Sequence, residues 1–184
     1  GKVTNLPAEH RALIAGTLVR HGPKSEIDKL LKEYVSSIDP DVKQSITAAL
    51  CSTKDVNLAK KLIDWGLKPG GTIKQQDIDY WFAYLMRNHY TREVIWQWFV
   101  DSWDYLAGLY SGGKHMDYFV WYSAGPISTV SWQKKFIEFF EPKQSITSLK
   151  RNILISKSEI ETRIKWRNRE EKNLVDYFSQ LKFH

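Results

Sequence analysis

The spacing of proline constrains the fold of this chain more than any other sequence feature. Six prolines occur in 184 residues, and each falls between runs of apolar residues that have helical spacing. Proline removes a backbone donor and clashes with the preceding turn, so it marks helix boundaries and is disfavoured inside helices. The prolines are Pro7, Pro23, Pro40, Pro69, Pro126 and Pro142. The chain is therefore predicted to consist of short helices joined by brief connections.

Apolar residues recur at intervals of three and four between these boundaries, as Ile78, Phe82 and Leu85 do. This spacing predicts helices, whereas the alternation expected of strands is nearly absent. The run "MDYFVWYS" at 116–123 is the one segment whose composition also suits a strand. Helix ends predicted in this way are accurate to about two to four residues. The predicted helices are 8–21, 24–37, 40–52, 54–66, 74–89, 91–111, 114–123, 129–141, 146–168 and 170–182.

Short helices with brief connections pack as antiparallel hairpins, because each helix must bury its apolar stripe against a neighbour. Stacked hairpins of roughly 30 to 40 residues each form a helical-repeat architecture. The predicted fold class is therefore all-α, a superhelical array of antiparallel helix hairpins (HEAT/ARM-like, an α-α superhelix). One helical-repeat domain is predicted over residues 1–184. No repeated sequence motif accompanies this prediction, which rests on helix geometry.

The segment "TREVIWQWFVDSWDYLAGLY" at 91–110 is unusually aromatic and has two interpretations, a binding platform or a buried helix. On a helical wheel its polar residues occupy one arc of about 80°, and nearly all the rest is apolar. A helix with one narrow polar arc is covered on several sides, which favours the core. Trp103→Ala is accordingly expected to cost about 3–5 kcal/mol. The arc is formed by Glu93, Gln97, Asp101, Asp104 and Gly108.

The residues that could carry chemistry do not form a catalytic or metal-binding motif. The five histidines lack ligand spacing such as H-E-x-x-H. The only cysteine, Cys51, lies on the apolar side of a predicted helix with no histidine near it in sequence, which favours a buried thiol over a nucleophile. The glycines of "LKPGGTIKQQD" lack the spacing of a phosphate-binding loop and predict a turn. We predict no catalytic residue and no metal ligand in this chain.

A net charge of +6 raises the question of a nucleic-acid partner. The densest basic stretch, "RIKWRNREEK" at 163–172, contains Glu170 and Glu171, and such mixed charge is typical of a solvated helix face. We predict no nucleic-acid partner, and the alternative of an independent helical-repeat scaffold that binds acidic proteins or nucleic acid stays open. No apolar run reaches the roughly 18–20 residues of a membrane span, so no membrane partner is predicted. The single cysteine and the lack of N-x-[ST] acceptors favour a cytoplasmic location.

Four blocks carry a family resemblance, which is clearest over residues 40–181. They are "DPDVKQSITAALCSTKDVNLAKKLIDWGL", "IKQQDIDYWFAYLMRNHYTREVIWQWFVDSWDYL", "ISTVSWQKKFIEFFE" and "LKRNILISKSEIETRIKWRNREEKNLVDYFSQL". In this order they resemble the C-terminal helical domain of zinc metalloaminopeptidases of the aminopeptidase N family. Thr91 stands where glycine is usual and Ser102 where asparagine is usual, and residues 1–39 add only helical character. The matching residues include Thr53, Asp55, Gln76, Asp77, Asn88, Arg92, Trp103 and Asp104.

This resemblance implies that the chain is the excised C-terminal part of a larger enzyme, which its first residue, Gly1, also suggests. The family's zinc motif H-E-x-x-H and its G-A-M-E-N segment lie in earlier domains and are absent from this sequence. Zinc is therefore expected in the upstream catalytic domain, and no cofactor is expected in this chain.

The resemblance also implies a non-catalytic role. The domain would close the substrate chamber and restrict peptide size and length, while the upstream domain removes N-terminal residues. The implied partners are the upstream catalytic domain of the same polypeptide and peptide substrates. Substrate-binding residues are not predicted individually, but basic side chains suit a wall that meets peptide carboxylates. The open candidates are Lys74, Arg87, Arg92, Arg151 and Arg163.

Overall fold

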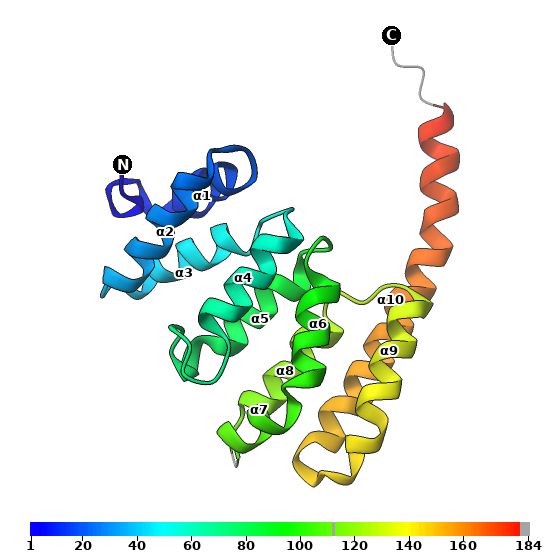
Figure 1. Ribbon diagram of the computed structural model, residues 1–184. Coiled ribbons are helices and arrows are strands. Elements are labelled where there is room, and N and C mark those ends of the chain that lie inside the picture. Colours follow the sequence, from blue (N-terminus) through cyan, green and yellow to red (C-terminus); the bar gives the residue numbers. More distant parts are fainter. Residues whose placement is uncertain (112, 181–184) are drawn as a thin grey trace. The chain divides into compact units, whose positions relative to one another are not determined.

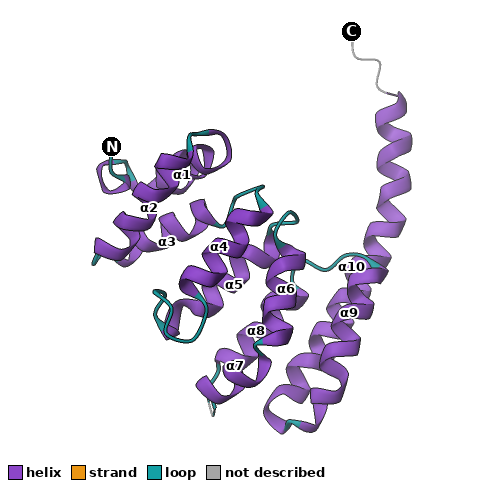
Figure 2. Cartoon of the chain, viewed as in Figure 1, coloured by secondary structure: helices purple, strands orange, loops and turns teal. Residues whose placement is uncertain are grey.

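The computed structural model describes residues 1–111 and 113–180, and these residues form helices and loops without a strand (Figure 1, Figure 2). The predicted all-α class is confirmed, and the run at 116–123 is helical. The superhelical form of the array stays a prediction. The α-helices are α1 (Ala8–His21), α2 (Lys24–Ser36), α3 (Pro40–Leu50), α4 (Val56–Gly66), α5 (Ile78–Arg87), α6 (Arg92–Asp101), α7 (Trp103–Leu109), α8 (His115–Ala124), α9 (Val130–Phe140) and α10 (Thr147–Gln180). Short 3₁₀ helices are η1 (Val3–Asn5), η2 (Gln75–Asp77) and η3 (Glu141–Ser145).

Prolines mark the starts of α1, α2 and α3, as the sequence predicts, and aspartates cap α3 and α4. Pro7 and Pro23 precede the first residues of α1 and α2, and Pro40 is the first residue of α3. The Asp39 carboxylate accepts hydrogen bonds from two backbone amides at the start of α3, and Asp55 accepts one at the start of α4. These caps satisfy amides that have no partner within the helix.

The described residues fall into two compact units, Gly1–Ser111 and residues 113–180. In the first unit α1 and α2 pack on α3, and α4 and α5 pack on α6. In the second unit α10 packs on α8, α9 and η3. The prediction of a single domain over 1–184 is not tested by this division. Fully buried apolar side chains form the core of each unit, among them Ile46, Leu50, Leu62, Phe82, Leu85 and Phe99 in the first and Phe119, Phe136, Phe140, Ile153 and Ile160 in the second.

Two predicted helix boundaries are wrong. The predicted helix 91–111 is two helices, because Ser102 adopts φ −97° and ψ 7° and ends α6 before α7 begins. The serine hydroxyl can compete with backbone groups for hydrogen bonds, which favours caps and turns over helix interiors. The predicted helices 146–168 and 170–182 are one helix, α10, since no proline or glycine interrupts residues 147–180. Residues 181 and 182 lie outside the described part.

A third boundary is corrected at the predicted helix 74–89. Its first turn is the 3₁₀ helix η2, and the α-helix α5 begins only at Ile78. Lys74 has extended backbone angles of φ −62° and ψ 144° and lies before both elements. The residues of "IKQQD" therefore form a connection and a tight turn, which places their side chains at the edge of the first unit's helices.

The aromatic segment 91–110 is buried on the side that the wheel predicts, despite the break at Ser102. Ile95, Phe99 and Leu106 are fully buried. Trp103 is only partly buried and meets the Phe99 ring edge-on at a centroid distance of 5.7 Å. The core interpretation is thus confirmed for Ile95, Phe99 and Leu106. The full burial expected of Trp103 is wrong. All five residues of the polar arc are exposed: Glu93, Gln97, Asp101, Asp104 and Gly108.

Candidate functional site

A cleft in the first unit is the candidate functional site. It has a volume of about 530 Å³ and lies between the end of α2, the start of α3 and the η2–α5 segment. We name it the aromatic cleft. Asp39 caps the start of α3, and Lys74 has an extended backbone immediately before η2. Its lining includes Tyr34, Ile38, Lys43, Lys74, Tyr80 and Trp81.

Two buried aromatic side chains form the floor of the aromatic cleft. Tyr34 is 3% exposed and Trp81 is 1% exposed. Their rings meet edge-on at a centroid distance of 5.5 Å, and the Trp81 Nε1–H donates to the Tyr34 hydroxyl at 3.3 Å. Burial raises the pKa of Tyr34, so this hydroxyl stays protonated at neutral pH. A protonated hydroxyl that already accepts from Trp81 keeps its own proton available for an acceptor.

The walls and rim of the aromatic cleft combine positive charge with exposed apolar surface. The Lys43 Nζ lies 4.8 Å from the centroid of the Tyr34 ring, and Lys74 is exposed. Ile38, in the loop between α2 and α3, is 97% exposed, and Tyr80 is 50% exposed. Exposed apolar residues around a concave surface are typical of binding sites. Asp77 lines the cleft as well, so its charged lining residues are two lysines and one carboxylate. Such a lining has the chemistry to hold an apolar side chain together with a carboxylate.

The motif residues that carry the family resemblance connect neighbouring turns of the first unit. The Asn88 side-chain amide donates to the backbone carbonyls of Cys51 at 2.9 Å and Thr53 at 2.7 Å. The Thr53 hydroxyl accepts from the Asp55 amide at 3.0 Å. Thr91, which departs from the family pattern, is also fully buried, and its hydroxyl donates to the Leu85 carbonyl at 2.8 Å. These residues hold the α3–α4 turn against the α5–α6 turn and have a structural role.

The structure separates the five basic candidates. Lys74 lines the aromatic cleft. Arg87 is exposed at the end of α5, and Arg151 is exposed on α10 beside a shallow hollow of the second unit. Arg92 donates through Nε to the Met86 carbonyl at 2.9 Å, at the end of α5. Of the candidates, only Lys74 belongs to the cleft.

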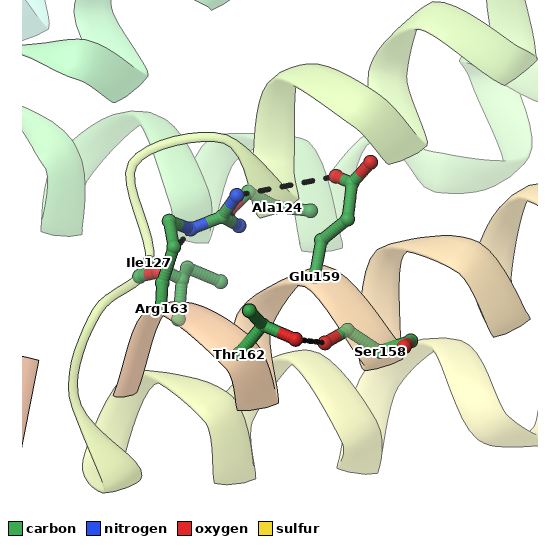
Figure 3. A network of polar contacts seen from close by, with 6 residues as sticks. All are labelled: Ala124, Ile127, Ser158, Glu159, Thr162 and Arg163. Atoms are coloured by element: carbon green, nitrogen blue, oxygen red, sulfur yellow. Dashed lines mark hydrogen bonds and ion pairs between the residues drawn. The ribbon is translucent and has the colours of Figure 1, made fainter. Parts of the chain in front are cut away.

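Arg163 has its main hydrogen bonds within the second unit. Its Nε donates to the Ile127 carbonyl at 3.0 Å and its Nη2 to the Ala124 carbonyl at 2.6 Å, while Glu159 lies 3.9 Å from Nη1 (Figure 3). Carbonyls at the end of a helix lack partners within that helix, and a cation there also interacts favourably with the helix dipole. Arg163 therefore fixes the end of α8 to α10, which is a structural role.

Cys51 and the glycine turn have the structural roles that the sequence predicts. Cys51 is buried, and burial raises the pKa of its thiol well above the ordinary value, which disfavours the reactive thiolate. Gly70 has φ +74°, a conformation that side chains rarely adopt. A Cβ on Gly71 would lie 2.4 Å from the Gly66 carbonyl oxygen. The two glycines thus form a tight turn after α4.

Within residues 1–111 and 113–180, no group of three or more His, Cys, Asp or Glu side chains could hold a metal ion. The donors present do not fit the zinc site that the family resemblance implies for the whole enzyme, so no step of zinc chemistry is assigned to these residues. None of the helices in this described part has the length and apolar character needed to span a bilayer. The predicted cytoplasmic location stays a prediction.

Comparison with protein families gives a match over most of the chain. Residues 1–162 match the family described as ERAP1-like C-terminal domain. The chain belongs to this family. The match includes residues 1–39, for which the sequence motifs gave no assignment, and it ends before the last turns of α10.

Individual relatives are aminopeptidases that are much longer than this chain. Aminopeptidase N of Lactobacillus helveticus is 33% identical over 138 residues, which cover 75% of this chain and 16% of the relative. Aminopeptidase N of Lactococcus lactis subsp. cremoris is 26% identical over 163 residues, which cover 88% of this chain and 19% of the relative. Human glutamyl aminopeptidase is 28% identical over 112 residues, which cover 58% of this chain and 11% of the relative. The chain thus spans less than a fifth of the relatives it matches.

Motif analysis did not find most residues of the aromatic cleft. Tyr34 and Ile38 lie in the N-terminal segment that contributed little to the resemblance, and Lys43 lies in α3 beside core positions. A signal does exist at Ile38, a large apolar residue between Ser37 and Asp39 in a predicted loop. An exposed isoleucine in a polar loop points to a contact surface, but its partner residues become evident only from the fold.

Proposed function

We propose that this chain is the non-catalytic C-terminal domain of a zinc-dependent aminopeptidase. The upstream domain of the same polypeptide removes N-terminal residues from peptides. This domain closes the substrate chamber and restricts the size and length of the peptides that enter. The observation that carries the proposal is the match of residues 1–162 to a C-terminal domain family, together with relatives that are named aminopeptidases and are several times longer.

The aromatic cleft supports a role in contacting peptides. Lys43 and Lys74 supply positive charge beside an aromatic floor, and the Tyr34 hydroxyl has a proton to donate. Peptides offer the matching groups, which are apolar side chains, carbonyl oxygens and a carboxylate. Selection of this kind acts through steric exclusion and electrostatics and needs no bond-making residue in the domain.

The basic stretch of α10 gives no support to a nucleic-acid scaffold. Arg163, Arg167 and Arg169 each lie within ion-pair distance of a glutamate, namely Glu159, Glu171 and Glu170. Nucleic-acid sites instead present clustered cations whose charge is available for phosphates. The aminopeptidase proposal therefore accounts for more of the chain than the scaffold does.

Hydrolysis assays with the isolated chain and the whole polypeptide test the proposal. The isolated chain is expected to release no product from an aminoacyl chromogenic substrate, and the whole polypeptide is expected to hydrolyse it in a chelator-sensitive manner. The gene is expected to encode H-E-x-x-H upstream of Gly1. Activity of the isolated chain after chelation, or a whole polypeptide without that motif, would contradict the proposal.

A further inference from the structure

The two halves of α10 differ in what they contact. The first half packs on α8, α9 and η3 through one buried stripe, which consists of Leu149, Ile153, Ser156, Ile160 and Ile164. After Ile164 the structure describes no further buried residue in α10. Figure 1 shows this second half, coloured orange to red, extending past the N-terminal end of α9. About four helical turns of α10 therefore lie beyond its packing partners within the second unit.

The second half of α10 nevertheless carries large apolar side chains on the same helix face. Leu174 and Phe178 lie 18 residues beyond Ser156 and Ile160, which is about five helical turns, so each pair shares one direction around the helix. Val175 lies beside them, and we name Leu174, Val175 and Phe178 the terminal stripe. These side chains are 49%, 62% and 56% exposed, respectively.

The terminal stripe lies on the same helix face as the buried stripe that packs on α8 and α9, but one charged pair separates the two. Between Ile164 and Leu174 this face contains Arg167 and Glu171, which pair with each other at 3.5 Å. Beyond Glu171 this face again carries apolar residues, with Phe178 three and four positions after Val175 and Leu174, the spacing with which an amphipathic helix binds another helix. In this second half Arg167 donates to the Ser128 hydroxyl at 3.4 Å, but none of the described side chains is buried. A helical segment of about 16 residues with so little tertiary packing is marginal in water, because helices in proteins are stabilised chiefly by packing of an apolar face.

We propose that the terminal stripe docks on an apolar helix face in the part of the aminopeptidase polypeptide that lies outside this chain. This inference rests on the proposed function, because that function supplies the partner. The chain spans 16% to 19% of its bacterial relatives, so most of such a polypeptide is tethered to the stripe at high effective concentration. Docking there fixes the end of α10 and extends the interface that begins at Leu149.

Hydrogen exchange measured on peptides covering residues 170–180 tests the docking. Exchange of these amides is expected to be at least about tenfold slower in the whole polypeptide than in the isolated chain, because docking suppresses local opening. The double variant Leu174→Ser with Phe178→Ser is expected to abolish the slowing. Trp166→Ser is the matched control, since Trp166 is also 56% exposed but lies about 120° around the helix from Phe178; it is expected to keep the slowing.

Three results would overturn the docking proposal. Equal exchange in the isolated chain and the whole polypeptide would mean that nothing covers the stripe. Slow exchange in the isolated chain that is lost on dilution would mean that a second copy covers it. Loss of slowing in Trp166→Ser would mean that the effect is not specific to this face. Exchange is read without substrate, so slowing in a polypeptide that fails the hydrolysis tests separates the docking from the proposed function.

Discussion

Two aromatic pairs of the first unit are equally buried but differ in polarity. Phe82 and Phe99 are fully buried with ring centroids 4.9 Å apart, and they carry no polar atom. Tyr34 and Trp81 are almost as buried, yet they hydrogen bond to each other and line the aromatic cleft. Burial alone therefore does not separate an aromatic side chain that only packs from one that also lines a cleft. An adjacent cavity and an available polar atom make that distinction.

Phe99→Ala is expected to have the largest effect on stability. Removing this fully buried ring leaves a cavity and should cost about 3–5 kcal/mol of unfolding free energy. Chemical denaturation of the isolated chain measures the loss. A cost below about 1 kcal/mol would contradict the assignment of the Phe82–Phe99 pair to packing.

Trp103→Ala is expected to cost less than Phe99→Ala, because Trp103 is only partly buried. A loss of about 1–3 kcal/mol is expected in place of the 3–5 kcal/mol that follows from full burial. Asp104→Ala, at the exposed neighbouring position, is the control and should change stability by less than about 0.5 kcal/mol. Denaturation midpoints of Trp103→Ala and Asp104→Ala measure the two losses of stability. A larger loss for Trp103→Ala than for Phe99→Ala would show that the relative burial of the two rings is misassigned.

Tyr34→Phe is expected to have a smaller effect on folding and a clear effect on binding. The change keeps the ring but removes the acceptor for the buried Trp81 Nε1–H, at a cost of about 1–2 kcal/mol. The affinity of the isolated chain for a peptide, measured by calorimetry, should fall because the hydroxyl donor is lost. Unchanged affinity would mean that the cleft floor only packs, as Phe82 and Phe99 do.

The fold was largely predictable because it depends on local patterns. Proline positions and apolar spacing located the helices, and the polar arc from Glu93 to Gly108 identified the exposed side of the aromatic segment. The break at Ser102 was missed because one residue outside helical angles hardly disturbs a wheel. The continuity of α10 was missed because its apolar spacing is interrupted by Arg167 and Glu171, although no helix-breaking residue is present.

The candidate site was less predictable because it depends on contacts between distant segments. Lys74 was one of five basic candidates, and nothing in the sequence separated it from Arg163, whose guanidinium fixes the end of α8 to α10. Tyr34 and Trp81 are 47 residues apart and meet only after α2 and α5 have packed around α3. Spacing along the chain carries no information about such a pair.

The central claim is that this domain restricts the length of peptide substrates. A series of peptides of increasing length, assayed with the whole polypeptide, tests this claim most directly. In the double variant Lys43→Ala with Lys74→Ala, kcat/KM for an aminoacyl chromogenic substrate should stay unchanged, because that substrate does not reach the cleft. For long peptides kcat/KM should fall by about tenfold, which is the effect of losing roughly 1.4 kcal/mol of interaction with the peptide. Lys68→Ala is the control, since Lys68 pairs with the exposed Asp64 and does not line the cleft. A length profile that is identical in the unmodified polypeptide and the double variant would contradict the claim.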